Sequence, residues 1–203
     1  MRHRTPSTAG ERPDVTVLDS RRAIFVISGT QGAGKTTVAS LLAQRFERGA
    51  HVSADTLQKM IVSGREWPVA SQTNVNTPEV EGEAGRQLRL RLRNMCLLGR
   101  SFFEAGFTAV LDDIVVGARI DDVREDLAGL DFLFVMLVPS VAAVRERERQ
   151  RGTDLWPEWE WLTEQFLNAP RDIGLWLDTS HQSADETVDE IMRRAWDEAL
   201  VLG

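Results

Sequence analysis

A short glycine-rich stretch, residues 29–36, constrains the fold of this chain more than any other feature of the sequence. It reads Gly-Thr-Gln-Gly-Ala-Gly-Lys-Thr and matches the phosphate-binding pattern G-x-x-x-x-G-K-S/T. An apolar, β-branched run of strand length, residues 23–27, precedes it, and a segment with apolar residues at helical spacing, residues 37–46, follows it. Strand, glycine loop and helix therefore occur in the order that a P-loop requires.

The P-loop pattern assigns chemistry to individual residues. Its glycines let successive backbone N–H groups point at phosphate oxygens, and the start of the following helix adds partial positive charge at the same place. Lys35 is expected to reach the β- and γ-phosphates, and the Thr36 hydroxyl is expected to hold Mg²⁺. We therefore predict a nucleoside triphosphate site formed by Gly29, Thr30, Gln31, Gly32, Ala33, Gly34, Lys35, Thr36 and Thr37.

Composition narrows the class of protein. The length of 203 residues fits one domain, and an apolar share of 42% is enough for a core. A net charge of −7 predicts no general affinity for nucleic acid or for an anionic membrane, and no apolar run is long enough to predict a membrane span. The single cysteine, Cys96, excludes an intrachain disulfide and fits a reducing compartment, so we expect a cytoplasmic protein.

Strand-like and helix-like segments alternate along the chain, and the strand-like segments are apolar runs. This pattern is typical of a parallel sheet covered by helices on both faces. The longest helical pattern runs from about residue 81 to 105 before Gly106, and a final helix is expected to reach about Leu200. We predict the α/β class, as a three-layer α/β/α P-loop NTPase domain with a five-stranded parallel sheet, whose strands lie near residues 23–27, 50–53, 108–112, 131–138 and 173–178.

Three aspartates lie at the carboxyl ends of predicted strands, where parallel sheets bind ligands. Asp112 and Asp113 end an apolar strand, where a carboxylate can hold Mg²⁺ or orient a substrate group, although Asp is also common in strand-end turns. Asp55 begins a helix, where it can be an N-cap, a base that accepts the proton of a substrate hydroxyl, or both. We predict that Asp112 and Asp113 join Thr36 at a metal ion and that Asp55 is catalytic.

An arginine-rich helix is expected over residues 141–151. Arg145 and Arg149 share one face of this helix, while Arg147 and Arg151 share another. Arginines at this place, after the fourth strand, can close over phosphates and stabilise charge in the transition state. A solvated helix whose arginines pair with the glutamates of the same segment fits the composition as well. We take Arg145 and Arg149, together with Lys35, as candidate catalytic residues.

Two regions carry few clear signals, one between the second and third predicted strands and the other after residue 155. Four arginines form a stripe along the long helix, and this stripe either meets an anionic substrate or is ordinary surface. Leu90 and Leu97 lie beside it, which suggests a substrate wall or a homodimer contact. Tryptophans after residue 155 either line an acceptor pocket or belong to the core. The stripe consists of Arg86, Arg89, Arg93 and Arg100, and the tryptophans are Trp156, Trp159 and Trp161.

Three motifs together resemble chloramphenicol phosphotransferase and its relatives, which are small P-loop kinases that phosphorylate a hydroxyl of a small molecule. The motifs are the P-loop, the Ser-Ala-Asp-Thr-Leu of residues 53–57 and the Leu-Asp-Asp-Ile-Val-Val-Gly of residues 111–117. The resemblance implies that Asp55 is the catalytic base, that the arginine helix belongs to a lid, and that the loop with Thr179 borders the adenine. It implies a kinase domain over residues 21–203, with an acceptor region at 57–105 and a lid region at 141–169. The polar composition of residues 1–20 predicts a flexible tail before this domain.

From these features we predict an ATP-dependent phosphotransferase that uses Mg²⁺ and moves the γ-phosphate to a hydroxyl of an antibiotic-like compound or metabolite. One alternative is a nucleotide or polynucleotide 5′-kinase, which needs an arginine-lined acceptor site. The arginine stripe is the only hint of such a site, and the net negative charge counts against long nucleic acid. The other alternative is a nucleotide-binding regulatory ATPase without an acceptor, which would need neither Asp55 nor a lid.

Overall fold

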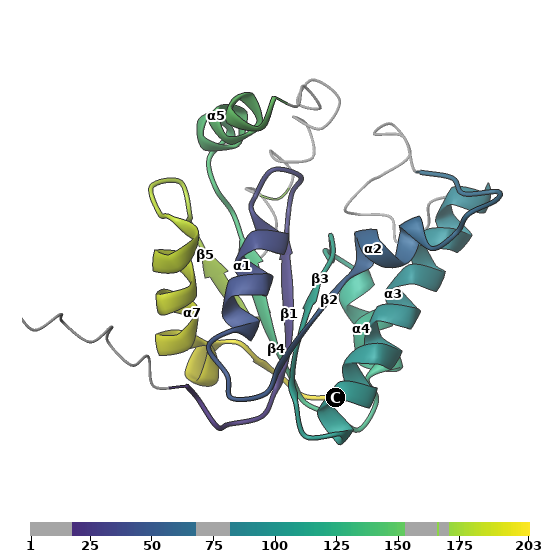
Figure 1. Ribbon diagram of the computed structural model, residues 1–203, viewed down its shortest axis with the longest axis horizontal. Helices are drawn as coiled ribbons and strands as arrows, with labels where there is room; N and C mark the ends of the chain where they lie inside the picture. Colours follow the sequence, from purple (N-terminus) through teal and green to yellow (C-terminus); the bar gives the residue numbers. More distant parts are fainter. Residues whose placement is uncertain (1–17, 68–81, 153–165, 167–170) are drawn as a thin grey trace, which may run out of the picture.

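The computed structural model describes residues 18–67, 82–152, 166 and 171–203. Its sheet has six strands, of which five are parallel and follow the order β2-β3-β1-β4-β5 (Figure 1). This arrangement confirms the predicted α/β class and the five parallel strands. The strands are β1 (Ile24–Gly29), β2 (Gly49–Ser53), β3 (Thr108–Asp112), β4 (Phe132–Leu137), β5 (Leu175–Leu177) and β6 (Leu200–Val201).

The short strand β6 differs from the prediction, which placed residue 200 at the end of a helix. The last helix ends at Glu198, and Leu200 and Val201 then pair antiparallel with the first residues of β4. Room for this pairing exists because β5 pairs only with the later part of β4, from Val135 onward. The pairing buries Val201 against the core.

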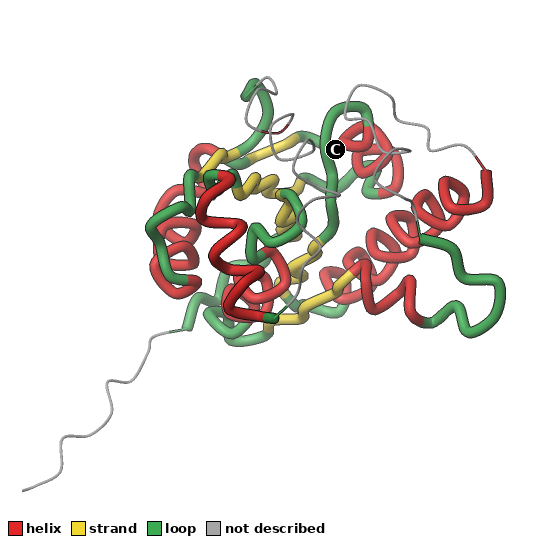
Figure 2. The backbone as a smooth tube through the Cα atoms, turned by 90° about the horizontal axis from the view of Figure 1, so that it is seen from above, coloured by secondary structure: helices red, strands yellow, loops and turns green. Residues whose placement is uncertain are grey.

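Helices cover both faces of the sheet and make the three layers that the sequence predicted (Figure 1). Figure 2 shows the strands between two groups of helices when the molecule is seen from above. The first group includes α1 and α7, which pack on one face of the sheet. The second group includes α3 and α4, which pack on the other face. The helices are α1 (Lys35–Ala43), α2 (Ala54–Lys59), α3 (Gly82–Glu104), α4 (Arg119–Asp126), α5 (Val141–Arg151) and α7 (Ala184–Glu198).

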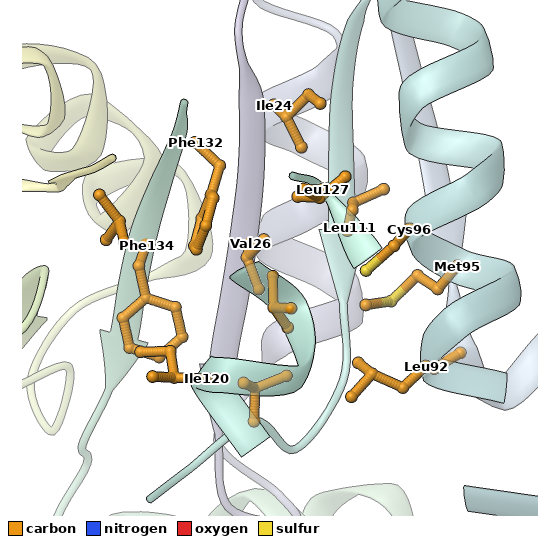
Figure 3. Packing of buried hydrophobic residues seen from close by; sticks show 14 of the residues in the cluster. Ile24, Val26, Leu92, Met95, Cys96, Leu111, Ile120, Leu127, Phe132 and Phe134 are labelled. Carbon is orange, nitrogen blue, oxygen red and sulfur yellow. The ribbon is translucent and has the colours of Figure 1, made fainter. Parts of the chain in front are cut away.

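The central strand β1 is buried on both sides because its side chains alternate between two apolar clusters. Ile24 and Val26 belong to the cluster formed with α3 and α4, which Figure 3 shows from close by. Phe25 and Ile27 belong to the cluster formed with α1 and α7. An apolar run without polar alternation is therefore what this strand requires.

The long helix α3 confirms the predicted pattern of residues 81–105 and ends before Gly106, whose φ of 89° suits glycine. Its inner face includes Leu92, Met95 and Cys96, which Figure 3 shows pointing toward the sheet. Burial raises the pKa of the Cys96 thiol to about 12. No helix among the residues described is long and apolar enough to cross a membrane.

Parts of the predicted division into regions lie outside the described residues. These parts are residues 1–17, most of the loop over residues 63–80 and the three tryptophans after residue 155. Asp19 falls within the predicted tail, yet it forms an isolated parallel bridge with Phe46. Ordered contacts with the domain therefore begin before residue 21.

The packing of α3 predicts a difference between two leucines on this helix. Leu92 is 1% exposed and Leu90 is 49% exposed. We expect Leu92→Ala to lower the free energy of unfolding by about 2–5 kcal/mol because it leaves a cavity under the sheet. Leu90→Ala should change it by less than about 0.5 kcal/mol. Urea unfolding of both variants measures the difference, and equal losses would contradict the assigned face of α3.

Candidate active site

Parallel pairing brings the ends of three strands to one level. Asp112 at the end of β3 is in register with Ile27 of β1 on one side and with Ser53 of β2 on the other. The P-loop follows β1, and α2 follows β2 directly. A pocket lies at this edge of the sheet, and it is lined by Lys35, Thr36, Asp55, Arg91, Asp112 and Asp113 among others. The carboxylates that were predicted from separate motifs therefore meet the P-loop in one place.

The backbone of the P-loop depends on glycine at two positions, one because of a close approach and both because of a positive φ. Gly29 has a φ of 151°, and a Cβ atom there would lie 2.6 Å from the carbonyl oxygen of Leu137. Gly34 has a φ of 94° and is the N-cap of α1. A residue with a side chain rarely adopts such a φ. The first N–H groups of α1 have no partner within the helix, and they start at the pocket, as an anion site requires.

Lys35 is the first residue of α1, and it lines the pocket. Its Nζ atom donates a hydrogen bond to the carbonyl oxygen of Thr30 at 2.9 Å, so the side chain folds back along the loop. Burial lowers the pKa of Lys35, while nearby carboxylates, Asp112 first among them, favour its charged form. The ammonium group is thus held among three carboxylates at the place where the P-loop pattern expects phosphates.

The structure separates the roles that Asp112 and Asp113 can have. Asp112 accepts a hydrogen bond from the Thr36 hydroxyl, with Oγ1 and Oδ2 2.8 Å apart. Its other oxygen, Oδ1, lies 2.6 Å from Nε2 of His51 on β2. Asp112 therefore belongs with the P-loop threonine. The sequence analysis gave His51 no role, because the pairing of β2 with β3 cannot be read from the chain.

Asp113 is occupied by a different partner. Arg91 on α3 donates to it through Nη2 and Nε, and Oδ1 of Asp113 also accepts from the backbone N–H of Ile114 at 2.7 Å. Arg91 is only 7% exposed, and its Nη1 atom lies 3.5 Å from Oδ1 of Asp55. One arginine thus joins Asp113 on the β3 side to Asp55 on the α2 side. The sequence analysis missed Arg91, although its place among apolar residues of α3 is a signal.

Asp55 lies within the first turn of α2 and lines the pocket. The N-cap of α2 is Ser53, so the interpretation of Asp55 as an N-cap is wrong. A carboxylate in the first turn is still favoured by the partial positive charge of the helix start. Its side chain is 63% exposed, which leaves the carboxylate open to a ligand in the pocket.

Helix α5 packs directly on the P-loop. The candidate catalytic arginines, Arg145 and Arg149, do not lie on the side of the helix that makes this contact. Its buried residues are Val144 and Glu148, and a Cβ atom on Gly32 would lie 2.7 Å from Cγ1 of Val144. The next residues on this inner side are Arg147 and Arg151, because they follow Val144 by three and seven positions. The inner side of α5 is therefore set by its contact with the loop.

The arginines of α5 divide according to this packing. Arg147 donates to the carbonyl oxygens of Ala33 and Thr179, and Arg151 lines the pocket. Arg149 points away, is 73% exposed and pairs with Glu146 at 2.7 Å. Arg145 is also on the exposed side. Of the four arginines, Arg147 and Arg151 are therefore the ones that line the two pockets described here, while a catalytic role of Arg145 and Arg149 stays a prediction.

A second pocket borders the first and is lined by Gly34, Thr37, Arg147, Thr179, Gln182 and Thr187 among others. Thr179 was predicted to border a nucleobase, and it lies here. Its Oγ1 atom is buried and has no hydrogen-bond partner in the described structure. A buried hydroxyl without a partner is costly, so this position is suited to a polar group of a ligand.

The stripe of arginines on α3 is engaged elsewhere. Arg86 pairs with Glu83, Arg89 pairs with Asp126 of α4, and Arg100 donates to the carbonyl oxygen of Ala128. Arg93 is exposed. None of these arginines is among the residues that line the two pockets described here, which favours the surface interpretation.

Comparisons with known proteins show the family of the chain and agree with its fold. A model of the family described as chloramphenicol phosphotransferase-like protein matches residues 22–196. A search of curated protein sequences finds no match. Among solved structures, the gluconokinase from Sinorhizobium meliloti is 19% identical, with a TM-score of 0.59, over 87% of this chain and 97% of that chain. The Mycobacterium tuberculosis APS kinase in complex with AMPPNP and APS is 16% identical, with a TM-score of 0.59, over 86% and 98%. The tunicamycin resistance protein of Deinococcus radiodurans is 18% identical, with a TM-score of 0.59, over 90% and 100%.

The buried pair of Arg91 and Asp113 predicts a strong coupling in stability. Arg91→Met should lower the free energy of unfolding by about 3–5 kcal/mol, because it leaves the Asp113 carboxylate buried without its partner. The double variant Arg91→Met/Asp113→Asn removes the charge and keeps an acceptor for Ile114. It should recover most of the loss. Chemical unfolding of the single and double variants measures this coupling, and additive losses would show that the pair is not coupled.

Proposed function

Because the chain belongs to the chloramphenicol phosphotransferase-like protein family, we propose that it is an ATP-dependent kinase that transfers the γ-phosphate to a hydroxyl of a small molecule. Membership of the family confirms the resemblance drawn from the three motifs. The observation that carries the proposal is that Lys35 of the P-loop and the open carboxylate of Asp55 line the same pocket. A triphosphate on the loop would present its last phosphate to a hydroxyl near Asp55.

The nucleotide side of the site is made by the P-loop and the second pocket. The N–H groups at the start of α1 and the ammonium of Lys35 bind the phosphates. The second pocket adjoins the same helix start at Gly34 and Thr37, so it is placed to take the nucleoside. The free hydroxyl of Thr179 supports this assignment, since a base or ribose can supply the missing partner. ATP fits this arrangement.

The residues present also fit a magnesium ion at the phosphates. The Thr36 hydroxyl and the Asp112 carboxylate lie 2.8 Å apart and are oxygen ligands of the kind that Mg²⁺ prefers. No group of three or more His, Cys, Asp or Glu side chains among the described residues can hold a metal alone, so these two residues would hold the ion together with phosphate oxygens and water. When bound, the ion neutralises charge on the phosphates.

The acceptor side is assigned to Asp55. Its carboxylate accepts the proton of the acceptor hydroxyl as the oxygen attacks the γ-phosphorus, the new O–P bond forms, and the bond to the β-phosphate oxygen breaks to leave ADP. Asp113 is less suited to this role because Arg91 and the backbone of Ile114 already occupy it. We retain residues 57–105 as the acceptor region, since α3 within this range carries Arg91, which lines the pocket together with Asp55.

A transfer assay tests the proposal. Purified protein is incubated with ATP, Mg²⁺ and a panel of hydroxylated metabolites, antibiotics and oligonucleotides, and ADP release is followed for each. We expect at least one small molecule to raise ADP release well above the rate without acceptor. ADP release that no acceptor changes would contradict a kinase and favour a regulatory ATPase.

Lys35 offers a test of the P-loop with a built-in control. We expect Lys35→Ala to abolish transfer while the fold survives, because Lys35 serves the phosphates and adds little to packing. Lys59 is the other lysine of the chain and is exposed, so Lys59→Ala should keep the wild-type rate. Transfer rates and thermal unfolding of both variants provide the comparison. Wild-type turnover in Lys35→Ala would refute the P-loop assignment.

Asp55 separates a kinase from a protein that only binds nucleotide. Asp55→Asn should leave nucleotide affinity nearly intact, since the P-loop and Asp112 are unchanged. Transfer to the acceptor should fall by about 10²–10⁴-fold, the usual effect of losing a positioned base. Calorimetry with ATP and a product assay measure the two properties on the same sample. If transfer continues at the wild-type rate, Asp55 is not the base.

The two faces of α5 predict opposite results for two arginines. Arg151→Ala should lower kcat by about 10³-fold, because Arg151 lines the pocket where charge develops during transfer. Arg149→Ala should leave kcat unchanged, since Arg149 pairs with Glu146 on the exposed side. Steady-state kinetics of the two variants under the same conditions decide the matter. A loss of kcat in Arg149→Ala alone would restore the assignment made from the sequence.

A further inference from the structure

His51 lies on β2, at the edge of the sheet, and its side chain reaches across to β3. Ser53 is in register with Asp112, and His51 comes two residues before Ser53. Because side chains alternate between the two faces of a sheet, His51 and Ser53 point to the same face as Asp112. Val52, between them, belongs to the apolar cluster formed with α3 and α4. His51 therefore faces the side of the sheet on which α1 packs.

Two donors from neighbouring elements hold the carboxylate of Asp112. Nε2 of His51 lies 2.6 Å from Oδ1, and the Thr36 hydroxyl donates to Oδ2 at 2.8 Å. An ionised carboxylate only accepts hydrogen bonds, so Nε2 of His51 carries the hydrogen in this contact. Asp112 itself is 4% exposed. Each of its oxygens thus has a donor of its own, one on β2 and one on α1.

The orientation of the Thr36 hydroxyl follows from this arrangement. A hydroxyl has one hydrogen and two lone pairs. Because the hydrogen goes to Asp112, the lone pairs of Oγ1 remain for a cation bound with the phosphates. Thr36 keeps this orientation only while the Oδ2 atom of Asp112 stays in place.

Thr36 alone would hold Asp112 poorly. Among the described residues, the side chain of Asp112 accepts hydrogen bonds from Thr36 and His51 and from no other donor. The Lys35 ammonium lies close enough to interact with the same carboxylate, and a charged donor attracts it more strongly than a hydroxyl does. Without His51, Asp112 would be free to turn toward Lys35. His51 opposes this rotation because it holds the second oxygen on the β2 side.

We propose that His51 is a positioning residue for the metal site at the phosphates, because it fixes the carboxylate that orients the Thr36 hydroxyl. The proposal rests on the proposed function, since it requires a nucleotide and its divalent cation at the P-loop. His51 is not among the residues that line the phosphate pocket, so it acts through Asp112. Its side chain is 21% exposed and makes its polar contact with Asp112.

Metal binding tests this inference without an acceptor. Mn²⁺ takes the place of Mg²⁺ as a paramagnetic probe, and the protein is kept in excess over a non-hydrolysable ATP analogue so that all of the analogue is bound. Electron paramagnetic resonance then measures the free ion. His51→Leu removes the donor and should raise the dissociation constant of Mn²⁺ by about 10- to 100-fold, the usual effect of losing a partner that holds a metal ligand. Affinity for the analogue in EDTA, measured by calorimetry, should stay nearly unchanged.

Two further variants separate positioning from packing. His51→Gln keeps an N–H donor at a similar reach and should restore most of the metal affinity. Glutamine does not titrate, so this rescue also excludes an effect of histidine charge. Arg100→Met removes a hydrogen bond between α3 and Ala128, lines neither pocket, and should bind the metal as the wild type does. His51→Ala provides the same readout if His51→Leu does not fold.

The outcomes distinguish this inference from the proposed function. Wild-type metal affinity in His51→Leu would overturn the inference and leave the kinase intact. Equal losses in His51→Leu and His51→Gln, or an equal loss of affinity for the analogue in EDTA, would also overturn it, because His51 would then serve packing alone. A metal site that depends on His51 in a protein that transfers no phosphate would support the inference and contradict the kinase. If the wild type with bound analogue takes up no Mn²⁺, both are overturned.

Discussion

Backbone pairing between β1 and β3, and between β2 and β3, places Ile27, Asp112 and Ser53 on one line across the sheet. The P-loop and the three aspartates of the site depend on this register, because each lies at the end of one of these three strands or within a few residues of it. The P-loop leaves β1, the two aspartates end β3, and α2 leaves β2. A shift of one residue between neighbouring strands would turn the side chains at their ends to the opposite face. The apolar clusters on both faces of β1 oppose such a shift, so packing and site geometry are tied together.

Around this line, the polar side chains are arranged in two separate sets. Thr36, Asp112 and His51 form one set beside the phosphates. Arg91, Asp113 and Asp55 form the other set on the acceptor side. Because each aspartate of β3 is held by its own partners, adjacent carboxylates can serve different purposes. The division fits the proposed role of Asp112 in Mg²⁺ binding, because Asp113 is already occupied by Arg91 and the backbone of Ile114.

Local patterns in the sequence were sufficient for the sheet, the P-loop and the three aspartates, since glycine spacing and apolar runs report on neighbouring residues. Contacts between distant elements were not accessible in the same way. The partnership of His51 with Asp112 requires that β2 lies beside β3, and β6 forms only because the start of β4 has a free edge. For α5, arginine at every second position hides the inner face, and only the burial of Val144 shows that Arg147 and Arg151 follow on the inner side. For Arg91, its place between Leu88 and Leu92 on the apolar side of α3 was the available signal.

The central claim is that a phosphate bound at the P-loop is passed to a hydroxyl held near Asp55, and ³¹P nuclear magnetic resonance of the reaction mixture tests it most directly. Wild-type protein is mixed with ATP, Mg²⁺ and an acceptor that raises ADP release. The account predicts a new phosphomonoester resonance that grows in step with ADP, with little inorganic phosphate. Growth of inorganic phosphate alone, with the acceptor unchanged, would contradict the account.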